Sequence, residues 1–333
     1  MVCDDELTSY KHLGPNNILD AIENEGFHCD GHIFALNSYE NRVYQVGIED
    51  DVPVVVKFYR PARWSDSAIL EEHQFTQELE KFEIPVISPL ANADGETLYH
   101  HKQFRFALYP RCGGRPPELE NPDHLLQLGR FIGRMHNVGA TNTYEHRPIL
   151  DIQTFGIDAS DYLLANKFIP LELEEAYQTL ARDLIKRINH CYERAGTIRF
   201  IRLHGDCHHS NILWRDDIPF ILDFDDARMG PAIQDIWMFL SGERNYMTAR
   251  LTELLDGYAE FMEFDPRELH LIEALRTLRM LHYNAWIARR WDDPAFPLAF
   301  PHFNTQRYWE DHILALREQA ALMDEMPLEW SGI

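Results

Sequence analysis

From Ile33 on, the hydrophobic positions in the first third of the chain change toward the period of two that is typical of β-strands, in segments rich in β-branched and aromatic residues. Segments with this pattern run over residues 33–36, 43–48 and 54–59, and polar stretches separate them. We therefore predict three antiparallel strands. Residues 84–86 and 104–109 are expected to complete the same sheet.

Helical spacing of hydrophobic residues dominates the rest of the chain. A helix is expected to begin at Ser65, because the hydrophobic positions that follow it keep helical register to Leu79. A shorter helix is expected between Pro15 and Gly26. Residues 141–160 show no clear period. Further helices are expected over residues 121–139, 171–193, 235–240, 247–264, 266–291 and 305–323.

These patterns together predict an α+β fold with two lobes. The N-terminal lobe, residues 1–109, would hold an antiparallel sheet with one helix, preceded by the short leading helix. The C-terminal lobe, residues 118–333, would be larger and mostly α-helical. Residues 110–117 are rich in proline and glycine, so we expect a hinge there. An ordinary linker is the alternative.

Composition narrows the class of protein. The 333 residues are 45% hydrophobic, which is enough for a buried core. With 31 basic and 54 acidic residues, the formal net charge is −23, and this charge would repel nucleic acids and anionic membrane surfaces. A cationic or neutral partner is therefore expected, although an acidic surface also serves solubility alone.

The cysteine pattern and the start of the chain predict the cellular compartment of the protein. The cysteines form no Cys-x-x-Cys pair, so we expect reduced thiols and no disulfide framework. They are Cys3, Cys29, Cys112, Cys191 and Cys207. The acidic N-terminus does not resemble a signal peptide, and no apolar run approaches the ~18 residues of a membrane span. A cytoplasmic protein without a membrane segment is expected.

The candidate chemistry follows an expected strand at residues 198–201. His204-Gly205-Asp206 is followed five positions later by Asn211, and then by Asp223 at the end of an apolar segment. Kinases use residues of these types in this order for phosphoryl transfer. Asp206 would accept the proton of the attacking hydroxyl. Asn211 and Asp223 would provide the oxygen ligands that hold Mg²⁺ on the phosphates of ATP.

The residues that follow Asn211 and precede Asp223 predict two strands that would hold the loop in place. Residues 212–214 and 220–222 are typical of two paired strands, which would make the loop rigid, and Asp235 could tether the loop from behind. In one alternative, the polar residues only cap turns. In another, Cys207, His208 and His209 hold zinc.

A lone cation interrupts the third expected strand. Lys57 lies among valines and aromatic residues, and an ammonium held on a strand can reach the phosphates of a nucleotide. Glu71 and Glu72 are adjacent on the next helix, so only one of them can face the sheet. We choose Glu72 because it shares a helix face with Phe75. The alternative is a snorkelling lysine and a solvated glutamate.

Two further segments complete the predicted nucleotide site. The turn at residues 37–42 lies where a phosphate-covering loop is expected, yet it contains no glycine. The Ser38 hydroxyl and nearby amides would therefore have to bind the phosphates. At the expected hinge, the backbone around Tyr109 and Arg111 would bind the adenine ring.

These residues resemble those of the aminoglycoside phosphotransferase and choline kinase branch of the protein-kinase-like fold, in which His-Gly-Asp stands in the catalytic loop. More narrowly, nearly the whole chain resembles the bacterial stress response kinase A family. The strings that carry this narrower resemblance are residues 36–45, 56–61, 70–75, 203–208, 211–215 and 291–297.

The resemblance implies an ATP- and Mg²⁺-dependent serine/threonine protein kinase that is cytoplasmic and monomeric and protects the cell from stress-induced death. It implies Asp206 as proton acceptor, Asn211 and Asp223 as Mg²⁺ ligands, and Ser38 as an ATP contact. It also implies Asp223 as an active-site residue. The preference for protein substrates follows from the resemblance alone.

Two other functions remain open at this point. The His-Gly-Asp motif and the net charge of −23 are also compatible with a small-molecule kinase for an alcohol of the aminoglycoside, choline or homoserine type. The absence of a glycine-rich loop is compatible with a nucleotide-binding scaffold that has no catalytic activity.

Overall fold

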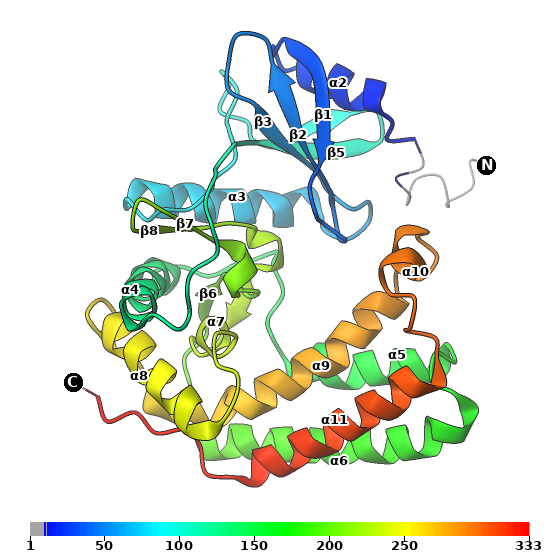
Figure 1. Ribbon diagram of the computed structural model, residues 1–333, viewed down its shortest axis with the longest axis vertical. Coiled ribbons are helices and arrows are strands. Elements are labelled where there is room, and N and C mark those ends of the chain that lie inside the picture. The colour runs from blue at the N-terminus through cyan, green and yellow to red at the C-terminus, as the bar shows by residue number, and fades with distance from the viewer. Residues whose placement is uncertain (1–9, 11, 333) are drawn as a thin grey trace. The chain divides into compact units, whose positions relative to one another are not determined.

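The computed structural model describes residue 10 and residues 12–332 (Figure 1). The acidic start of the chain and Cys3 lie outside the described residues. The chain forms two compact units. The first comprises Met1–Pro117, Tyr144–Arg147 and His209–Ala227, and the second comprises Glu118–Thr143, Pro148–His208 and Arg228–Ile333. The main sheet lies in the first unit and most helices lie in the second. The predicted α+β class is therefore confirmed.

The sheet of the first unit has five antiparallel strands in the order β1-β2-β3-β5-β4. They are β1 (Cys29–Ala35), β2 (Arg42–Ile48), β3 (Val54–Phe58), β4 (Tyr99–His101) and β5 (Phe104–Pro110). The prediction for residues 84–86 is wrong. Val86 makes only an isolated bridge with Ile221, and Pro85 has no N–H group for a ladder. The fifth strand is instead β4, whose three residues are too few to show a period.

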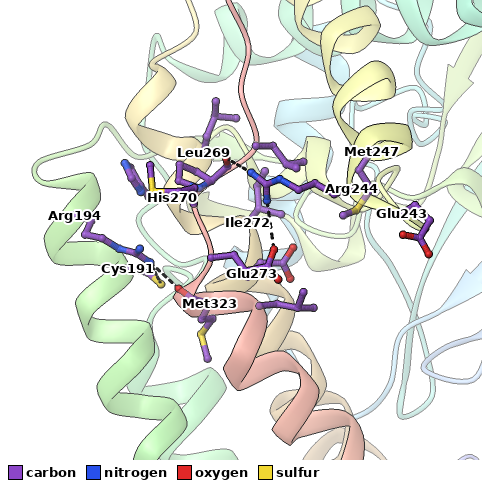
Figure 2. Close-up of a pocket in the computed structure, with 16 residues that line it drawn as sticks. Cys191, Arg194, Glu243, Arg244, Met247, Leu269, His270, Ile272, Glu273 and Met323 are labelled. Carbon is purple, nitrogen blue, oxygen red and sulfur yellow. Dashed lines mark hydrogen bonds and ion pairs between the residues drawn. The ribbon is translucent and has the colours of Figure 1, made fainter.

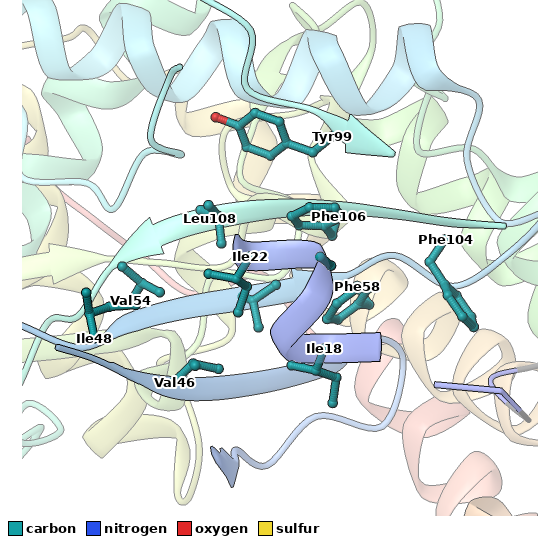
Figure 3. Close-up of a cluster of buried hydrophobic side chains, with 12 residues drawn as sticks. Ile18, Ile22, Val46, Ile48, Val54, Phe58, Tyr99, Phe104, Phe106 and Leu108 are labelled. Atoms are coloured by element: carbon teal, nitrogen blue, oxygen red, sulfur yellow. The ribbon is translucent and has the colours of Figure 1, made fainter. Parts of the chain in front are cut away.

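One face of this sheet is covered by the leading helix, α2 (Pro15–Glu23). Ile18 and Ile22 of α2 pack with Val56 and Phe58 of β3 in one buried cluster (Figure 3). Burial of a side chain of this size stabilises a fold by roughly 1.5–3 kcal/mol. Because side chains alternate along a strand, Lys57, which lies between Val56 and Phe58, points to the opposite face.

The opposite face is covered by α3 (Asp66–Lys81), which begins where the sequence predicts. The hydroxyl of Ser65 accepts a hydrogen bond from the backbone N of Ala68 at 3.2 Å, so it caps the first turn. Ile69 is fully buried in a cluster with Tyr59, the residue after β3. The hydrophobic face of α3 therefore holds the helix against the sheet.

The last part of the first unit is a hairpin of β7 (Ile212–Arg215) and β8 (Ile218–Ile221). The paired strands predicted there are confirmed. Asp216 and Asp217 form the turn with positive φ angles of 52° and 59°, which is the conformation of a tight two-residue hairpin turn. A turn this short fixes the register of the two strands.

The second unit is mainly helical. Its helical elements are α4 (Pro122–Gly139), η1 (Gln153–Ile157), α5 (Asp158–Ala165), α6 (Leu171–Ala195), α7 (Gln234–Trp237), α8 (Arg244–Ala259), η4 (Pro266–Leu271), α9 (Ile272–Ala288), α10 (Ala295–Ala299) and α11 (Gln306–Asp324). Glycines let α4 and α8 approach closely. A Cβ atom at Gly129 of α4 would lie 2.0 Å from the carbonyl oxygen of Leu254 of α8. Any larger residue at Gly129 would push the helices apart.

Two predictions in the second unit need correction. The strand expected at residues 198–201 begins only at Ile201, because β6 (Ile201–Leu203) pairs over just three residues with β9 (Arg228–Gly230). The helix expected at residues 235–240 is the single turn α7. Residues 141–160 include the π-helix η1, whose wider turn does not follow the 3.6-residue period.

Candidate functional site

Lys57 is the centre of a buried charge cluster in the first unit. Its side chain points to the face of the sheet that α3 covers and is only 7% exposed. Its Nζ lies 3.0 Å from Oδ1 of Asp223, 3.3 Å from Oδ1 of Asp225 and 3.6 Å from Oε1 of Glu72. The structure thus brings together three of the predicted site residues, Lys57, Glu72 and Asp223. Asp225 joins them in the cluster, although its place in the sequence did not single it out.

These carboxylates keep the Lys57 side chain protonated. Burial by itself lowers the pKa of an ammonium group, but Asp223, Asp225 and Glu72 raise the Lys57 pKa well above its usual value. A buried ammonium held in this way is a fixed positive charge. Such a charge can bind a phosphate group strongly, because ionised partners form the stronger hydrogen bonds.

The adjacent residues Glu71 and Glu72 have different partners. Oε2 of Glu72 lies 2.6 Å from an NH2 nitrogen of Arg147. The carboxylate of Glu71 accepts hydrogen bonds from the backbone N atoms of residues 145–147 at 2.6, 2.9 and 2.8 Å. The prediction that Glu72 is the partner of Lys57 is confirmed. Arg147 was missed because it lies in the segment that shows no period.

Asp223 and Asn211 are held at the same end of the hairpin. Ile212 pairs with Ile221, and the backbone N of Leu222 donates to the carbonyl oxygen of Asn211 at 3.1 Å. Asp223 has a φ of +62°, a left-handed conformation that costs a residue other than glycine ~1–2 kcal/mol. Strain of this kind gathers at functional positions. The Asp223 side chain is 47% exposed.

The oxygen atoms of Asn211 and Asp223 are of the type that a hard cation such as Mg²⁺ prefers. Oδ1 of the neighbouring Asp225 is buried and lies in an ion pair with Lys57 at 3.3 Å, but accepts no hydrogen bond from the described residues. Proteins usually bind Mg²⁺ through one or two carboxylates together with substrate phosphates. No group of three His, Cys, Asp or Glu residues in the described part of the chain could hold a metal ion. The oxygen atoms of Asn211 and Asp223 are of the types that can hold a cation together with substrate phosphates.

The loop between β1 and β2 is held by arginines. Nε of Arg60 donates to the carbonyl oxygen of Glu40 at 2.9 Å, and its NH2 group donates to the carbonyl oxygen of Tyr39 at 3.1 Å. An NH1 nitrogen of Arg63 lies 3.7 Å from Oε2 of Glu40. Ser38 is half-buried and makes no hydrogen bond with the residues that the structure describes. Arginine contacts thus hold a loop that has no glycine.

Arg63 also reaches the segment that follows Asp223. Its guanidinium donates to Oδ2 of Asp225 and, at 2.8 Å, to Oδ1 of Asp226. We expect Arg63→Ala to lower the free energy of unfolding by about 3 kcal/mol, because the buried Asp225 carboxylate loses one of its cations. Denaturant unfolding measures this loss. Hydrogen exchange in residues 37–42 should also become faster.

Arg215→Ala is the matched control for Arg63→Ala. The Arg215 side chain lies in the same unit and is 49% exposed, so its removal should change the free energy of unfolding by less than about 0.5 kcal/mol. Equal losses in the two variants would show that Arg63 does not stabilise the cluster.

Tyr109 and Arg111 lie near the end of β5, and both side chains have partners within the first unit. The hydroxyl of Tyr109 lies 3.0 Å from the hydroxyl of Tyr59. Nε of Arg111 donates to Oε1 of Gln45 at 2.9 Å. The contact with adenine that the sequence predicts would therefore fall to the backbone of this segment.

The loop at Asp206 belongs to the second unit, and Asp235 organises it. The fully buried carboxylate of Asp235 accepts hydrogen bonds from the backbone N atoms of His204 and Gly205, both at 2.8 Å. Gly205 has a φ of 84°, which other residues rarely adopt. The backbone N of Asp206 donates to Nδ1 of His204 at 3.2 Å. The predicted tether by Asp235 is confirmed.

A buried chain of hydrogen bonds supports Asp235 from α4 and α8. Nε2 of His136 lies 3.1 Å from Oδ2 of Asp235, and its Nδ1 lies 3.1 Å from the hydroxyl of Tyr258. Burial raises the pKa of Tyr258 well above its usual value, so the phenol stays neutral. Sequence reasoning missed His136, because it occupies an ordinary core position of a helical pattern.

Cys207 follows Asp206 but is fully buried. Burial, with a smaller contribution from Asp235 and Asp206, raises the pKa of the Cys207 thiol well above its usual value. Oxidation proceeds through the thiolate and needs access to the sulfur. Cys207 therefore behaves as a packed core residue.

Glu268 gives the second unit a pH-dependent stability. It is 4% exposed and accepts a hydrogen bond from the backbone N of Ile233 at 2.8 Å, and burial raises its pKa to about 7 from its usual 4.5. The folded state therefore holds this proton more tightly than the unfolded state. The contribution of Glu268 to stability is full below about pH 4.5 and is lost as the pH rises through about 7, a loss on the order of 3 kcal/mol.

We expect Glu268→Gln to remove this part of the pH dependence. The free energy of unfolding of the variant minus that of the wild type should increase by on the order of 3 kcal/mol from pH 5 to pH 8. Urea unfolding at both pH values measures the gain. Glu263→Gln, at an exposed position close in the sequence, is the control and should follow the wild type. Parallel profiles for Glu268→Gln and the wild type would disprove the assignment.

A separate pocket in the second unit contains none of the predicted site residues. It has a volume of about 280 Å³ and is lined by parts of α6, α8 and α9 and by the segment after α11 (Figure 2). The NH2 nitrogen of Arg194 donates to the carbonyl oxygen of Met323 at 2.9 Å. The NH2 nitrogen of Arg244 donates to the carbonyl oxygen of Pro327 at 2.5 Å. These arginines hold the C-terminal segment in place.

Comparison with known proteins shows which family and which relatives this chain is similar to. Residues 33–272 match the model of the phosphotransferase enzyme family. Stress response kinase A of Escherichia coli O157:H7 is 43% identical over 321 residues, which cover 96% of this chain and 97% of the relative. Serine/threonine protein kinase RdoA of Salmonella typhimurium (strain LT2) is 41% identical over 325 residues, which cover 98% of each chain.

A solved structure shows the fold. Amicoumacin kinase hAmiN, in complex with AMP-PNP, Ca²⁺ and Ami, matches this chain with a TM-score of 0.68 and 18% sequence identity. The match covers 95% of this chain and 96% of that chain. The kinase-like fold expected from the sequence is confirmed.

Proposed function

This chain belongs to the phosphotransferase enzyme family and, within it, to the stress response kinase A family, and on that basis we propose that it is an ATP- and Mg²⁺-dependent serine/threonine protein kinase. The observation that carries the proposal is the buried ammonium of Lys57, 3.0 Å from Asp223 and 3.6 Å from Glu72. A lysine that is fixed on a strand and paired with a helix glutamate is the phosphate-binding arrangement of kinases.

The first unit provides the nucleotide contacts in this proposal. Lys57 would bind the phosphates of ATP, and Glu72 would keep its side chain in place. The Ser38 hydroxyl and the amides of its loop would cover the phosphates from the other side. The backbone near Tyr109 and Arg111 would bind the adenine ring, with residues 110–117 as the hinge.

Asn211 and Asp223 would hold the metal ion. When it is bound, Mg²⁺ neutralises part of the charge on the phosphates. The hairpin contributes a rigid end that keeps these two donors together, and the exposed carboxylate of Asp223 can turn toward a ligand without leaving its backbone position. Asp223 thus serves both the metal and the ammonium of Lys57.

Asp206 would accept the proton of the acceptor hydroxyl. As that proton moves to Asp206, the hydroxyl oxygen forms a bond to the γ-phosphorus and the bond from phosphorus to ADP breaks, so ADP leaves. The carboxylate of Asp235, through the amides of His204 and Gly205, fixes the backbone that carries this base. Proton acceptance is effective only when the base is held in position.

A small-molecule kinase is the second candidate. The fold of amicoumacin kinase hAmiN is that of this chain, and a net charge of −23 would attract a cationic alcohol. The same phosphate-binding and proton-accepting residues would serve either acceptor. Only the acceptor site separates the two functions.

Labelled ATP can distinguish the candidates. The purified protein would be incubated with Mg²⁺ and γ-labelled ATP, first with cell extract proteins and then with aminoglycosides, choline and homoserine. We expect label in the protein fraction, and in the kinase itself, on serine or threonine. Label in a small alcohol alone would replace the proposal by the second candidate. No label in any acceptor would leave only a nucleotide-binding scaffold.

The proposal includes a cellular role. As a member of this family, the protein would act as a monomer in the cytoplasm and protect the cell from stress-induced death. The described part of the chain holds no helix that is long and apolar enough to cross a membrane, and Cys29, Cys112, Cys191 and Cys207 form no disulfide. Light scattering tests the monomer, and survival of a deletion strain under stress tests the role.

A further inference from the structure

Arg279 of α9 contacts the proposed base directly. Its NH1 nitrogen lies 2.5 Å from Oδ1 of Asp206, and Nε2 of His208 lies 3.4 Å from Oδ2 of the same carboxylate. Asp206 is the only hydrogen-bond partner of Arg279 among residues 10 and 12–332. The Arg279 side chain is 39% exposed. A guanidinium has five N–H donors, so Arg279 can hold the base and still bind a second anionic group.

The other charged residues of α9 do not neutralise Arg279. Glu273 pairs with Arg276, whose Nε lies 3.2 Å from Oε2 of Glu273. Glu273 also accepts a hydrogen bond from Gln319 of α11. Among the described residues, the carboxylate of Asp206 is the ion-pair partner of Arg279, so the guanidinium lies at the position where an acceptor hydroxyl would meet that base.

Aromatic residues continue from Arg279 along α9, where His282 and Trp286 are partly buried against Phe155 and Phe296 and Tyr283 is exposed. His282, Tyr283 and Trp286 follow at spacings of three to four residues, which places them on the same side of the helix. Tyr283 is 43% exposed and stacks on Trp286 with ring centroids 5.6 Å apart. Just beyond the helix, the guanidinium carbon of Arg290 lies 5.2 Å from the centre of a Trp286 ring. We call these five residues the α9 stripe.

The length and charge of the α9 stripe fit a polypeptide. From Arg279 to Trp286 the helix rises about 10 Å, which an extended chain covers with about three residues. Each end carries an arginine, although the chain as a whole has a net charge of −23. Local positive charge in an acidic protein is complementary to an acidic ligand and would disfavour a cationic alcohol.

We propose that the α9 stripe binds the acceptor polypeptide and selects segments in which an acidic residue lies next to the serine or threonine. Arg279 binds that acidic residue. Tyr283 and Trp286 bind an aromatic or aliphatic side chain about three residues further along, and Arg290 favours a second acidic residue beyond it. This inference rests on the proposed protein kinase function and adds the class of substrate to it.

Peptide phosphorylation tests the proposal. Serine peptides with glutamate, alanine or lysine at each position around the serine would be compared by kcat/KM. For the wild type, we expect glutamate beside the serine to be preferred over alanine by about tenfold, because it adds one charge-assisted hydrogen bond. Arg290→Gln removes the charge without reversing it, so it should abolish the preference for the distal acidic residue and lower kcat/KM for the peptides that carry that residue.

Arg279→Gln should abolish the preference beside the serine. Because Arg279 also contacts the base, the turnover of the Arg279→Gln variant will fall for all peptides. The readout is therefore the ratio of the KM value for the alanine peptide to that for the glutamate peptide. Binding of a fluorescent peptide in which alanine replaces the serine gives the same ratio without catalysis. Arg307→Glu is the control, because its side chain is 89% exposed on α11 in the same unit, and it should keep the wild-type preferences.

The outcomes separate this inference from the proposed function. If the wild type labels proteins but shows no preference for acidic peptides, or if both variants keep that preference, the α9 stripe is not the acceptor site and the kinase function stands. If small alcohols are labelled and proteins are not, the kinase function fails and this inference fails with it.

Discussion

Asp206→Asn should lower the rate of phosphoryl transfer by about 10³-fold, because an amide cannot accept the proton of the acceptor hydroxyl. Asparagine has nearly the same shape, and the loop is held by Asp235 through the backbone of His204 and Gly205. The fold and the affinity for ATP should therefore stay close to those of the wild type. Single-turnover kinetics with labelled ATP measure the rate, and nucleotide titration measures the affinity.

Asp311→Asn is the control for this experiment. The Asp311 side chain lies on α11 in the same unit and is 70% exposed, so the same chemical change there should leave the rate unaltered. If Asp206→Asn kept the wild-type rate, Asp206 would not be the base, and the proposed mechanism would have to be abandoned.

Lys57→Met should remove turnover and also weaken the fold. Asp223, Asp225 and Glu72 lie within 3.6 Å of the ammonium, so methionine leaves their negative charges with fewer cations. We expect the free energy of unfolding to fall by about 3 kcal/mol. Turnover should fall by roughly 10²-fold or more, because the phosphates lose a positioned charge. Urea unfolding and labelled-ATP kinetics check the two effects.

Two further variants make the test of Lys57 specific. Lys81→Met changes the same residue type at the exposed end of α3 and should have little effect on either quantity. Lys57→Arg keeps the charge, so it should restore more of the stability than of the turnover, since the larger guanidinium cannot occupy the same position. Wild-type turnover in a folded Lys57→Met protein would refute the proposed nucleotide site.

Local sequence patterns were sufficient to predict the elements whose own residues show a clear hydrophobic pattern. Short segments rich in β-branched and aromatic residues located β2, β3 and β5, and the capping residue Ser65 located the start of α3. Such elements bury one face, so the hydrophobic period records their structure directly. The hairpin of β7 and β8 was also found, because residues 212–214 and 220–222 are two short apolar segments that lie close together in the sequence.

Elements whose structure depends on a distant partner were not predictable. Residues 84–86 look like a strand, yet their only bridge is to Ile221 in the hairpin. The short strands β4, β6 and β9 have only three residues each, which is too few for a period. The π-helix η1 departs from the helical period altogether. The bridge at Val86 and the pairing of β6 with β9 are decided by contacts between segments that are far apart in the sequence, whereas β4 pairs with the adjacent β5 and was missed because it is short.

The sequence by itself determined which residue types this protein has for its chemistry and on which elements they lie. Lys57 stands on a strand, Glu72 stands on the buried side of a helix, and Asp223 follows an apolar segment. Their order and spacing were visible without coordinates, because strand and helix periods decide which way each side chain points.

Only the tertiary structure decided which charges meet. Arg63 and Arg147 join the Lys57 cluster, Asp235 binds two backbone amides of the loop at Asp206, and Arg279 contacts that base. None of these pairs is close in the sequence. An ion pair or a hydrogen bond depends on separation in space and on burial, and both are set by how the chain packs.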